Sequence, residues 1–208
     1  GQGYIHYQKG SLIFYALSDY IGEKKLNKAL GKYVNKVAFQ EPPYTTSIDL
    51  VNHVKEVVPD SLSYIIKDMF ETITLYQNRI VSTESKKLEN GKYQVDIEFK
   101  VSKYRNDEKG KIFYGNEKRD SISYKNEKMK KPDYSVYLSD YIDVGIFGKD
   151  NEDREVELYL KKHKINSIHN KISIITDNEP IEVGIDPYNK LIDTNSEDNR
   201  KKIKEEIL

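Results

Sequence analysis

Apolar side chains follow two different periods along the chain. In residues 8–75 they recur at spacings of three and four, which places them on one face of an α-helix. From residue 93 onward they alternate with polar side chains, which is the pattern of a half-buried strand. The sequence therefore predicts an α+β fold in which a helical segment is followed by an antiparallel β-sandwich.

The first two helices are expected at residues 8–21 and 23–37. Gly22 separates them, and glycine is the residue most typical of a helix end. One face of the second helix carries an apolar stripe: Leu26, Ala29, Leu30, Tyr33, Val34 and Val37. A row of lysines occupies the opposite face: Lys24, Lys28, Lys32 and Lys36. This distribution predicts an amphipathic helix whose lysines are solvated, with no binding role.

Two further helices follow a proline loop at residues 40–44, where a helix cannot continue. Thr46 with Asp49 three positions later resembles a capping box, so the third helix is expected to begin there and to end before Pro59. A fourth helical stripe runs through residues 62–73. The helical part is thus expected to end near Tyr76 to Arg79.

The strands begin with a hairpin. Asn90-Gly91 is a strong turn signal, which predicts one strand at residues 79–87 and a partner strand at residues 93–101. Shorter alternating runs predict further strands around residues 142–146, 156–160, 172–174 and 181–185.

The predicted organisation is a helical segment at residues 1–78, a β-sandwich at residues 79–193 and a polar tail at residues 194–208, which is either disordered or a helix stabilised by contacts with the rest of the fold. Residues 104–133 hold little apolar periodicity, and residues 117–131 carry six basic and three acidic side chains. An anion-binding patch is one interpretation of that stretch, but we favour a solvated hairpin or loop, since the charge excess is small.

Composition narrows the classes of function. The chain has 208 residues, of which 37% are hydrophobic and 33% charged, so it is long enough to bury a core. Basic and acidic residues are equal at 34 each, which disfavours nucleic acid as a partner. There is no cysteine, so disulfides, thiolate metal sites and cysteine nucleophiles are excluded. No apolar run approaches the length of a membrane span, so direct membrane insertion by this segment is not expected, and the compartment stays undetermined.

Histidine-based metal chemistry has no complete motif here. None of His6, His53, His163 and His169 is followed by glutamate, so the H-E-x-x-H spacing that places two imidazoles on one helix face is missing. His163 and His169 lack a third ligand, and we expect surface histidines. No zinc site is predicted within the chain. A glycine-rich phosphate loop and a G-x-S-x-G elbow are also missing from the sequence.

A short motif, Tyr7-Gln-Lys-Gly10, stands before the first predicted helix. With the helices and Pro43-Tyr-Thr-Thr-Ser-Ile-Asp-Leu50 it resembles the segment after the zinc site in aminopeptidase-N-like gluzincin metallopeptidases. In that family a Tyr-Glu-Lys-Gly motif, usually preceded by proline, carries a tyrosine that helps to stabilise the transition state. Here His6 stands at the proline position and Gln8 at the glutamate position.

The second half is similar to the β-domain of bacterial members of this family. The residues that carry the similarity are Val144-Gly-Ile-Phe-Gly148, Leu158-Tyr-Leu160 and Gly184-Ile-Asp-Pro-Tyr-Asn-Lys-Leu-Ile-Asp193. Some of those bacterial proteins are fused behind a permease-like membrane half of an ABC transporter, which would anchor the parent in the bacterial inner membrane.

The resemblance implies that this chain is the C-terminal fragment of a zinc-dependent aminopeptidase and is inactive alone. Tyr7 would donate to the oxyanion, while the zinc cofactor of the parent would be held by an upstream catalytic half, with a peptide as substrate. Two alternatives stay open. The fragment is instead a non-catalytic interaction or structural domain of a degenerate peptidase, or Tyr7 is one of 17 tyrosines that simply packs. An intact upstream H-E-x-x-H would separate the two function classes.

Overall fold

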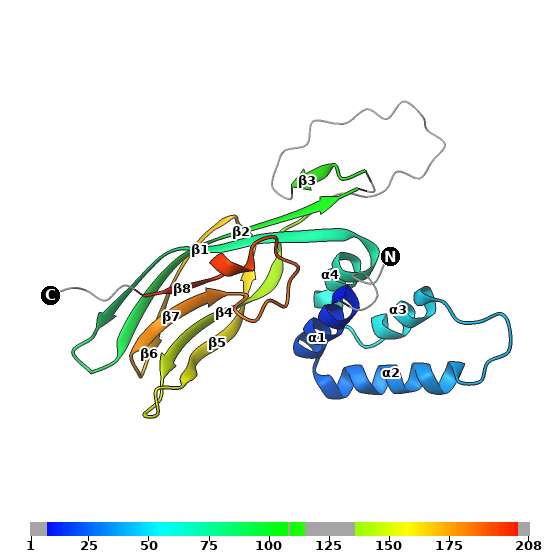
Figure 1. The fold of residues 1–208 in the computed structure, drawn as a ribbon, viewed down its shortest axis with the longest axis horizontal. Coiled ribbons are helices and arrows are strands. Elements are labelled where there is room, and N and C mark those ends of the chain that lie inside the picture. The colour runs from blue at the N-terminus through cyan, green and yellow to red at the C-terminus, as the bar shows by residue number, and fades with distance from the viewer. Residues whose placement is uncertain (1–7, 108, 115–135, 204–208) are drawn as a thin grey trace. The chain divides into compact units, whose positions relative to one another are not determined.

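The computed structural model of the chain describes residues 8–107, 109–114 and 136–203 (Figure 1). The chain divides into two compact units, Gly1–Thr74 and Leu75–Leu208. Helices make up the first unit and strands the second, which confirms the α+β fold class predicted from the two periods.

In its described residues, from Gln8 onward, the helical unit contains three regular helices and one mixed helical stretch. They are α1 (Gly10–Ile21), α2 (Glu23–Val37), α3 (Ser47–Lys55), and the sequence η2 (Asp60–Leu62), α4 (Ser63–Ile66) and η3 (Lys67–Glu71). Gly22 takes φ = 88° between α1 and α2, a left-handed conformation that a side chain would disfavour. The core of this unit is formed by residues such as Leu17, Val54 and Ile65, which are almost fully buried.

The capping box predicted at the start of α3 is present. The carboxylate of Asp49 accepts hydrogen bonds at 2.8 Å from the backbone N–H and from the hydroxyl of Thr46. These bonds hold the pKa of Asp49 below its ordinary value, the backbone bond contributing most. The apolar stripes are narrower than predicted, because Val34 in α2 and Ile48 in α3 are 57% and 69% exposed.

The second unit is a sandwich of two sheets (Figure 1). One sheet contains β1 (Ile73–Lys87), β2 (Tyr93–Asn106), β3 (Ile112–Tyr114) and β6 (His169–Thr176). The other has the order β5 (Glu155–Ile165), β4 (Asp140–Lys149), β7 (Pro180–Ile185), β8 (Arg200–Lys202). The pairs β2–β3, β2–β6, β4–β5, β4–β7 and β7–β8 are all antiparallel.

The core lies between the two sheets. It combines inward-facing residues of β2, such as Val95, Ile97 and Phe99, with residues of β4 and β7, such as Ile146 and Val183. The alternation of apolar and polar residues on these strands has the structural meaning that we predicted, because every second residue faces the opposite sheet. The only helical element between the strands described is a single 3-10 turn, η4 (Ser196–Asp198).

The junction between the two parts differs in position from the prediction. β1 begins at Ile73, before the residues where the helical part was expected to end. Thr74, Tyr76 and Asn78 are buried and alternate with less buried residues, so the strand period already governs this stretch. At the other end, the hairpin is where Asn90-Gly91 predicted it, with Leu88 N donating to Lys92 O at 2.8 Å.

The prediction of a disordered tail from residue 194 is wrong as far as residue 203. β8 pairs with β7, with Lys201 opposite Val183. The Arg200 guanidinium lies 4.1 Å from the centroid of the Phe147 ring and donates to Glu155 and Glu182, each at 2.6 Å. Because these partners are distant in sequence, local composition gave no sign of the strand. Residues 204–208 lie outside the part described.

The polar stretch at residues 104–133 is described only in part. β3 pairs with the end of β2, with Phe113 opposite Arg105. The loop interpretation of residues 117–131 falls outside the described residues and stays a prediction.

Candidate functional site

The motif before α1 is described from Gln8 onward, so Tyr7 lies outside the described residues. Gln8 and Lys9 form a helical turn that leads into α1. Lys9 is half-buried, its Nζ donates to the carbonyl oxygen of Thr72 at 3.4 Å, and burial lowers its pKa. The lysine of the motif thus links the beginning of the helical unit to its end.

The histidines of the described part are not brought together. His53 Nδ1 lies 2.8 Å from the carbonyl oxygen of Asp49 in α3, within the helical unit. His163 is in β5 and His169 in β6, which belong to different sheets. His163 Nε2 lies 2.7 Å from the Tyr159 hydroxyl, and burial, with a smaller effect of Lys161, lowers its pKa. Among the residues described, no group of three or more histidine, cysteine, aspartate or glutamate side chains could hold a metal ion.

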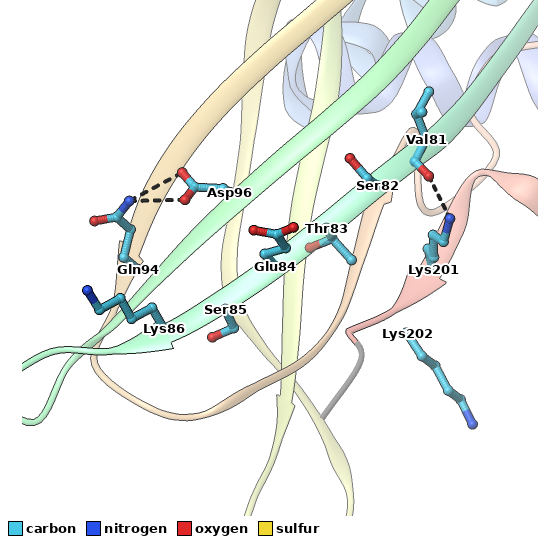
Figure 2. Close-up of a pocket in the computed structure, with 10 residues that line it drawn as sticks. All are labelled: Val81, Ser82, Thr83, Glu84, Ser85, Lys86, Gln94, Asp96, Lys201 and Lys202. Atoms are coloured by element: carbon cyan, nitrogen blue, oxygen red, sulfur yellow. Dashed lines mark hydrogen bonds between the residues drawn. The ribbon is translucent and has the colours of Figure 1, made fainter. Parts of the chain in front are cut away.

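A polar groove of about 610 Å³ runs along the second half of β1, between β2 and β8 (Figure 2). Its lining consists of Val81, Ser82, Thr83, Glu84, Ser85, Lys86, Gln94, Asp96, Lys201 and Lys202. Figure 2 shows Lys201 reaching from β8 to β1, where its Nζ donates to the carbonyl oxygen of Val81 at 2.6 Å. On the β2 side Gln94 Nε2 donates to the Asp96 carboxylate at 3.1 and 3.3 Å.

The groove is lined by side chains of both charge signs and by one hydroxyl without a described hydrogen-bond partner. Lys86, Lys201 and Lys202 line the groove together with Glu84 and Asp96, so neither sign of charge dominates. Thr83 is 8% exposed, and its hydroxyl has no hydrogen-bond partner among the residues described. The groove therefore offers mixed charges and backbone groups, which suit a polar, extended ligand better than an apolar one.

The β-sandwich unit contains two clusters of buried charge. In the first, Lys103 Nζ is 3.0 and 2.9 Å from the two Asp140 carboxylate oxygens, and the Tyr76 hydroxyl donates to the same carboxylate at 2.8 Å. All three side chains are buried. Because both charges are paired and hydrogen-bonded, the cluster joins β1, β2 and β4 without leaving an isolated buried ion.

The second cluster holds the turn after β7. Asp143 Oδ2 accepts from Lys162 Nζ at 2.8 Å and from Lys190 Nζ at 2.9 Å. Asp186 accepts from the backbone N–H groups of Lys190 and Leu191 at 3.0 and 2.9 Å. Burial raises the pKa of Asp186 to about 7, although these two bonds act in the opposite direction. The cluster fixes the turn over residues 186–191 against β4.

Sequence reasoning did not find these clusters, although one signal was present. Lys103 and Arg105 continue the inward-facing positions of β2 beyond Val101, and both are buried. A charged residue in register with an apolar stripe indicates a buried partner. The acidic partner, Asp140, comes from β4 and could not be identified from β2 alone.

No protein-family model matches the chain, and no significantly similar curated protein was found. In the part of the chain that is described, no helix is both long and apolar enough to cross a membrane.

Proposed function

We propose that this chain is the C-terminal part of a zinc-dependent aminopeptidase of the aminopeptidase-N-like gluzincin type. The proposal rests on the order of its parts: the Tyr7-Gln-Lys-Gly10 motif, a helical unit and a β-sandwich. The observation that carries it is the position of Lys9 just before α1, from which its ammonium donates to the carbonyl oxygen of Thr72 at 3.4 Å. This contact supports a fixed position for the lysine of the motif, rather than a solvated side chain, and Tyr7 stands two positions before it.

The residues described do not fit a zinc ion, because they provide no ligand group for it. The proposal therefore assigns zinc to the upstream catalytic half of the parent, and this chain alone is expected to cleave no peptide. The role assigned to this chain is that of Tyr7. Its phenol is neutral at pH 7, with an ordinary pKa of about 10. It would donate a hydrogen bond to the oxyanion formed when water attacks the scissile carbonyl group of a peptide.

The test is a kinetic comparison in the full-length parent. Tyr7→Phe removes one hydroxyl, and loss of one oxyanion donor is expected to lower kcat by about 10²–10³-fold. KM should change little, because the ground-state carbonyl needs the donor less than the oxyanion does. Tyr15→Phe is the matched control, since Tyr15 is 49% exposed in α1 and lies outside the motif. A Tyr7→Phe parent with a kcat within a factor of about two of the unmodified enzyme would return Tyr7 to a packing role.

The alternative function is a non-catalytic interaction or structural domain of a degenerate peptidase that is fused to a membrane transporter. The polar groove along β1 favours it, because such a surface can bind a partner without catalysis. This alternative predicts that the parent lacks an H-E-x-x-H motif, binds no zinc in stoichiometric amount and gives no peptide cleavage with or without Tyr7.

A further inference from the structure

The backbone of β1 changes its orientation along the strand. Tyr76 N donates to Ile192 O at 2.9 Å, and Tyr76 O accepts from Thr194 N at 3.0 Å, so the backbone groups of this even-numbered residue point away from β2. At the hairpin, Leu88 N donates to Lys92 O at 2.8 Å, so an even-numbered residue there points toward β2. A regular strand would keep one parity throughout.

Burial along β1 shows the same change. Tyr76, Asn78 and Ile80 are buried at even positions, and the next buried residue is Thr83, at an odd position. One extra residue between Ile80 and Thr83 accounts for both shifts and corresponds to a β-bulge. After the bulge, odd-numbered residues direct their backbone groups outward, as Val81 does toward Lys201.

Among the residues described, the outer edge of β1 is covered as far as Val81. β1 ends its sheet, with β2 as its strand neighbour. The segment at residues 192–194 pairs with Tyr76, and Lys201 caps the carbonyl of Val81. Beyond Val81, no strand of the described chain pairs with the outward backbone groups of Thr83, Ser85 and Lys87. The polar groove of Figure 2 includes this part of β1 and also reaches Gln94 and Asp96 of β2 and Lys201 and Lys202 of β8.

We propose that this edge pairs antiparallel with the same edge of a second copy of the chain, with the two-fold axis at Ser85. In that register Ser85 lies opposite Ser85 of the second copy, and Thr83 lies opposite the second copy's Lys87. These are the residues whose N–H and C=O groups face outward, so the pairing satisfies every one of them. An arbitrary peptide would also offer backbone groups, but the side chains favour a second copy.

Charge is self-complementary about Ser85. Glu84 and Lys86 are exposed on the same face of β1. The two-fold axis places Glu84 of each copy opposite Lys86 of the other, so this contact occurs once on either side of the axis. Opposite charges at such a position stabilise strand pairing. Thr83, whose hydroxyl has no partner in the described chain, faces the second copy's Lys87, which carries a donor.

The expected product is a weak dimer, because a few residue pairs bury little surface. Sedimentation velocity of the whole chain over a concentration series should show a reversible monomer–dimer equilibrium. Glu84→Lys and Lys86→Glu should each weaken the dimer by about tenfold, since each places like charges opposite each other twice. The double variant Glu84→Lys/Lys86→Glu should restore the affinity of the unmodified chain.

Mixing the two single variants gives the sharpest test. Chains with two lysines and chains with two glutamates repel their own kind, and we expect them to form a heterodimer at least as tight as the original homodimer. Ser85→Pro should abolish pairing while preserving the fold, because the lost N–H points away from β2. Glu152→Lys, in the exposed turn after β4, is the control: it makes the same change in charge as Glu84→Lys and should leave dimerisation unchanged.

Circular dichroism of each variant would establish that the fold is retained. A chain that is monomeric at all concentrations would overturn the proposal. So would a dimer unaffected by Glu84→Lys, or single variants that fail to associate with each other on mixing.

Discussion

Lys190 and Asp143 form a buried ion pair, with Lys190 Nζ 2.9 Å from Asp143 Oδ2 and side chains that are 7% and 5% exposed. Lys162 donates to the same oxygen at 2.8 Å. One carboxylate oxygen thus accepts from two ammonium groups, one of which has little access to water. A buried pair of this kind contributes little relative to an apolar pair, but removing one partner strands the other charge.

The first prediction concerns this carboxylate. Asp143→Ala should lower the free energy of unfolding of the sandwich by about 3–5 kcal/mol, because Lys190 would remain buried after losing this ion pair. Urea denaturation measures the change. Lys149→Ala is the matched control, since it removes an exposed pair with Asp153 and should cost no more than about 0.5 kcal/mol. Equal losses in the two variants would show that Lys190 finds water or another partner.

The second prediction concerns pH and Asp186. Its pKa is raised to about 7, mainly by burial, while in the unfolded chain the carboxyl titrates near the ordinary value of 3.8. Between these values the folded state keeps a proton that the unfolded chain releases, so rising pH favours unfolding. The stabilising contribution is complete below about pH 4 and is lost as the pH rises to about 7.

Asp186→Asn removes this titration. The free energy of unfolding of the unmodified chain should therefore decrease relative to that of the variant, by up to about 1.4 kcal/mol per pH unit, across that window. The variant also loses one of two acceptors for backbone N–H groups, so only the pH dependence of the difference is diagnostic. Parallel stability curves from pH 4 to pH 7 would mean that Asp186 is ionised in the fold throughout.

The third prediction concerns the C-terminal strand. Arg200→Ala removes the contact with Phe147 and the two ion pairs with Glu155 and Glu182. We expect β8 to open more often, with amide hydrogen exchange at Ile203, which donates to Ile181 O, becoming at least about tenfold faster. Lys202→Ala is the control, because Lys202 is exposed in the same strand. Unchanged exchange at Ile203 would place the stability of β8 in its backbone bonds alone.

The strand that contains Arg200 could not be predicted from the sequence, whereas other strands could. The strands with alternating apolar residues, such as Val95 and Ile97 in β2, were predictable because one face of each strand must be buried. β8 was missed because it is three residues long and its stabilising partners lie on β4, β5 and β7. Local pattern encodes which face is buried, but not which distant side chain will pair with a lone arginine.

The same limit applies to the candidate site. The second half of β1 was predictable as a strand, but the bulge that we infer before Thr83 rests on the contacts of Tyr76 and Leu88 and on the burial along β1. The role of Tyr7 stays a prediction from resemblance, since Tyr7 lies outside the described residues.

The last prediction compares two glycines in the two units. A Cβ on Gly148, in β4, would lie 2.7 Å from the carbonyl oxygen of Glu179 and 2.8 Å from Leu158 Cδ1. The first atom belongs to the backbone, so β4 or the residues before β7 must move, and Gly148→Ala should cost the sandwich about 1–3 kcal/mol.

Gly31 is the opposite case. It lies inside α2, where an added Cβ would meet nothing within 4 Å. Alanine is better than glycine in a helix interior by about 1 kcal/mol, so Gly31→Ala should stabilise the helical unit by roughly that amount. Because the substitutions lie in different units, amide exchange of α2 and of β4 should be followed separately in each variant. Faster exchange in α2 of Gly31→Ala would show that another group occupies the space beside this glycine.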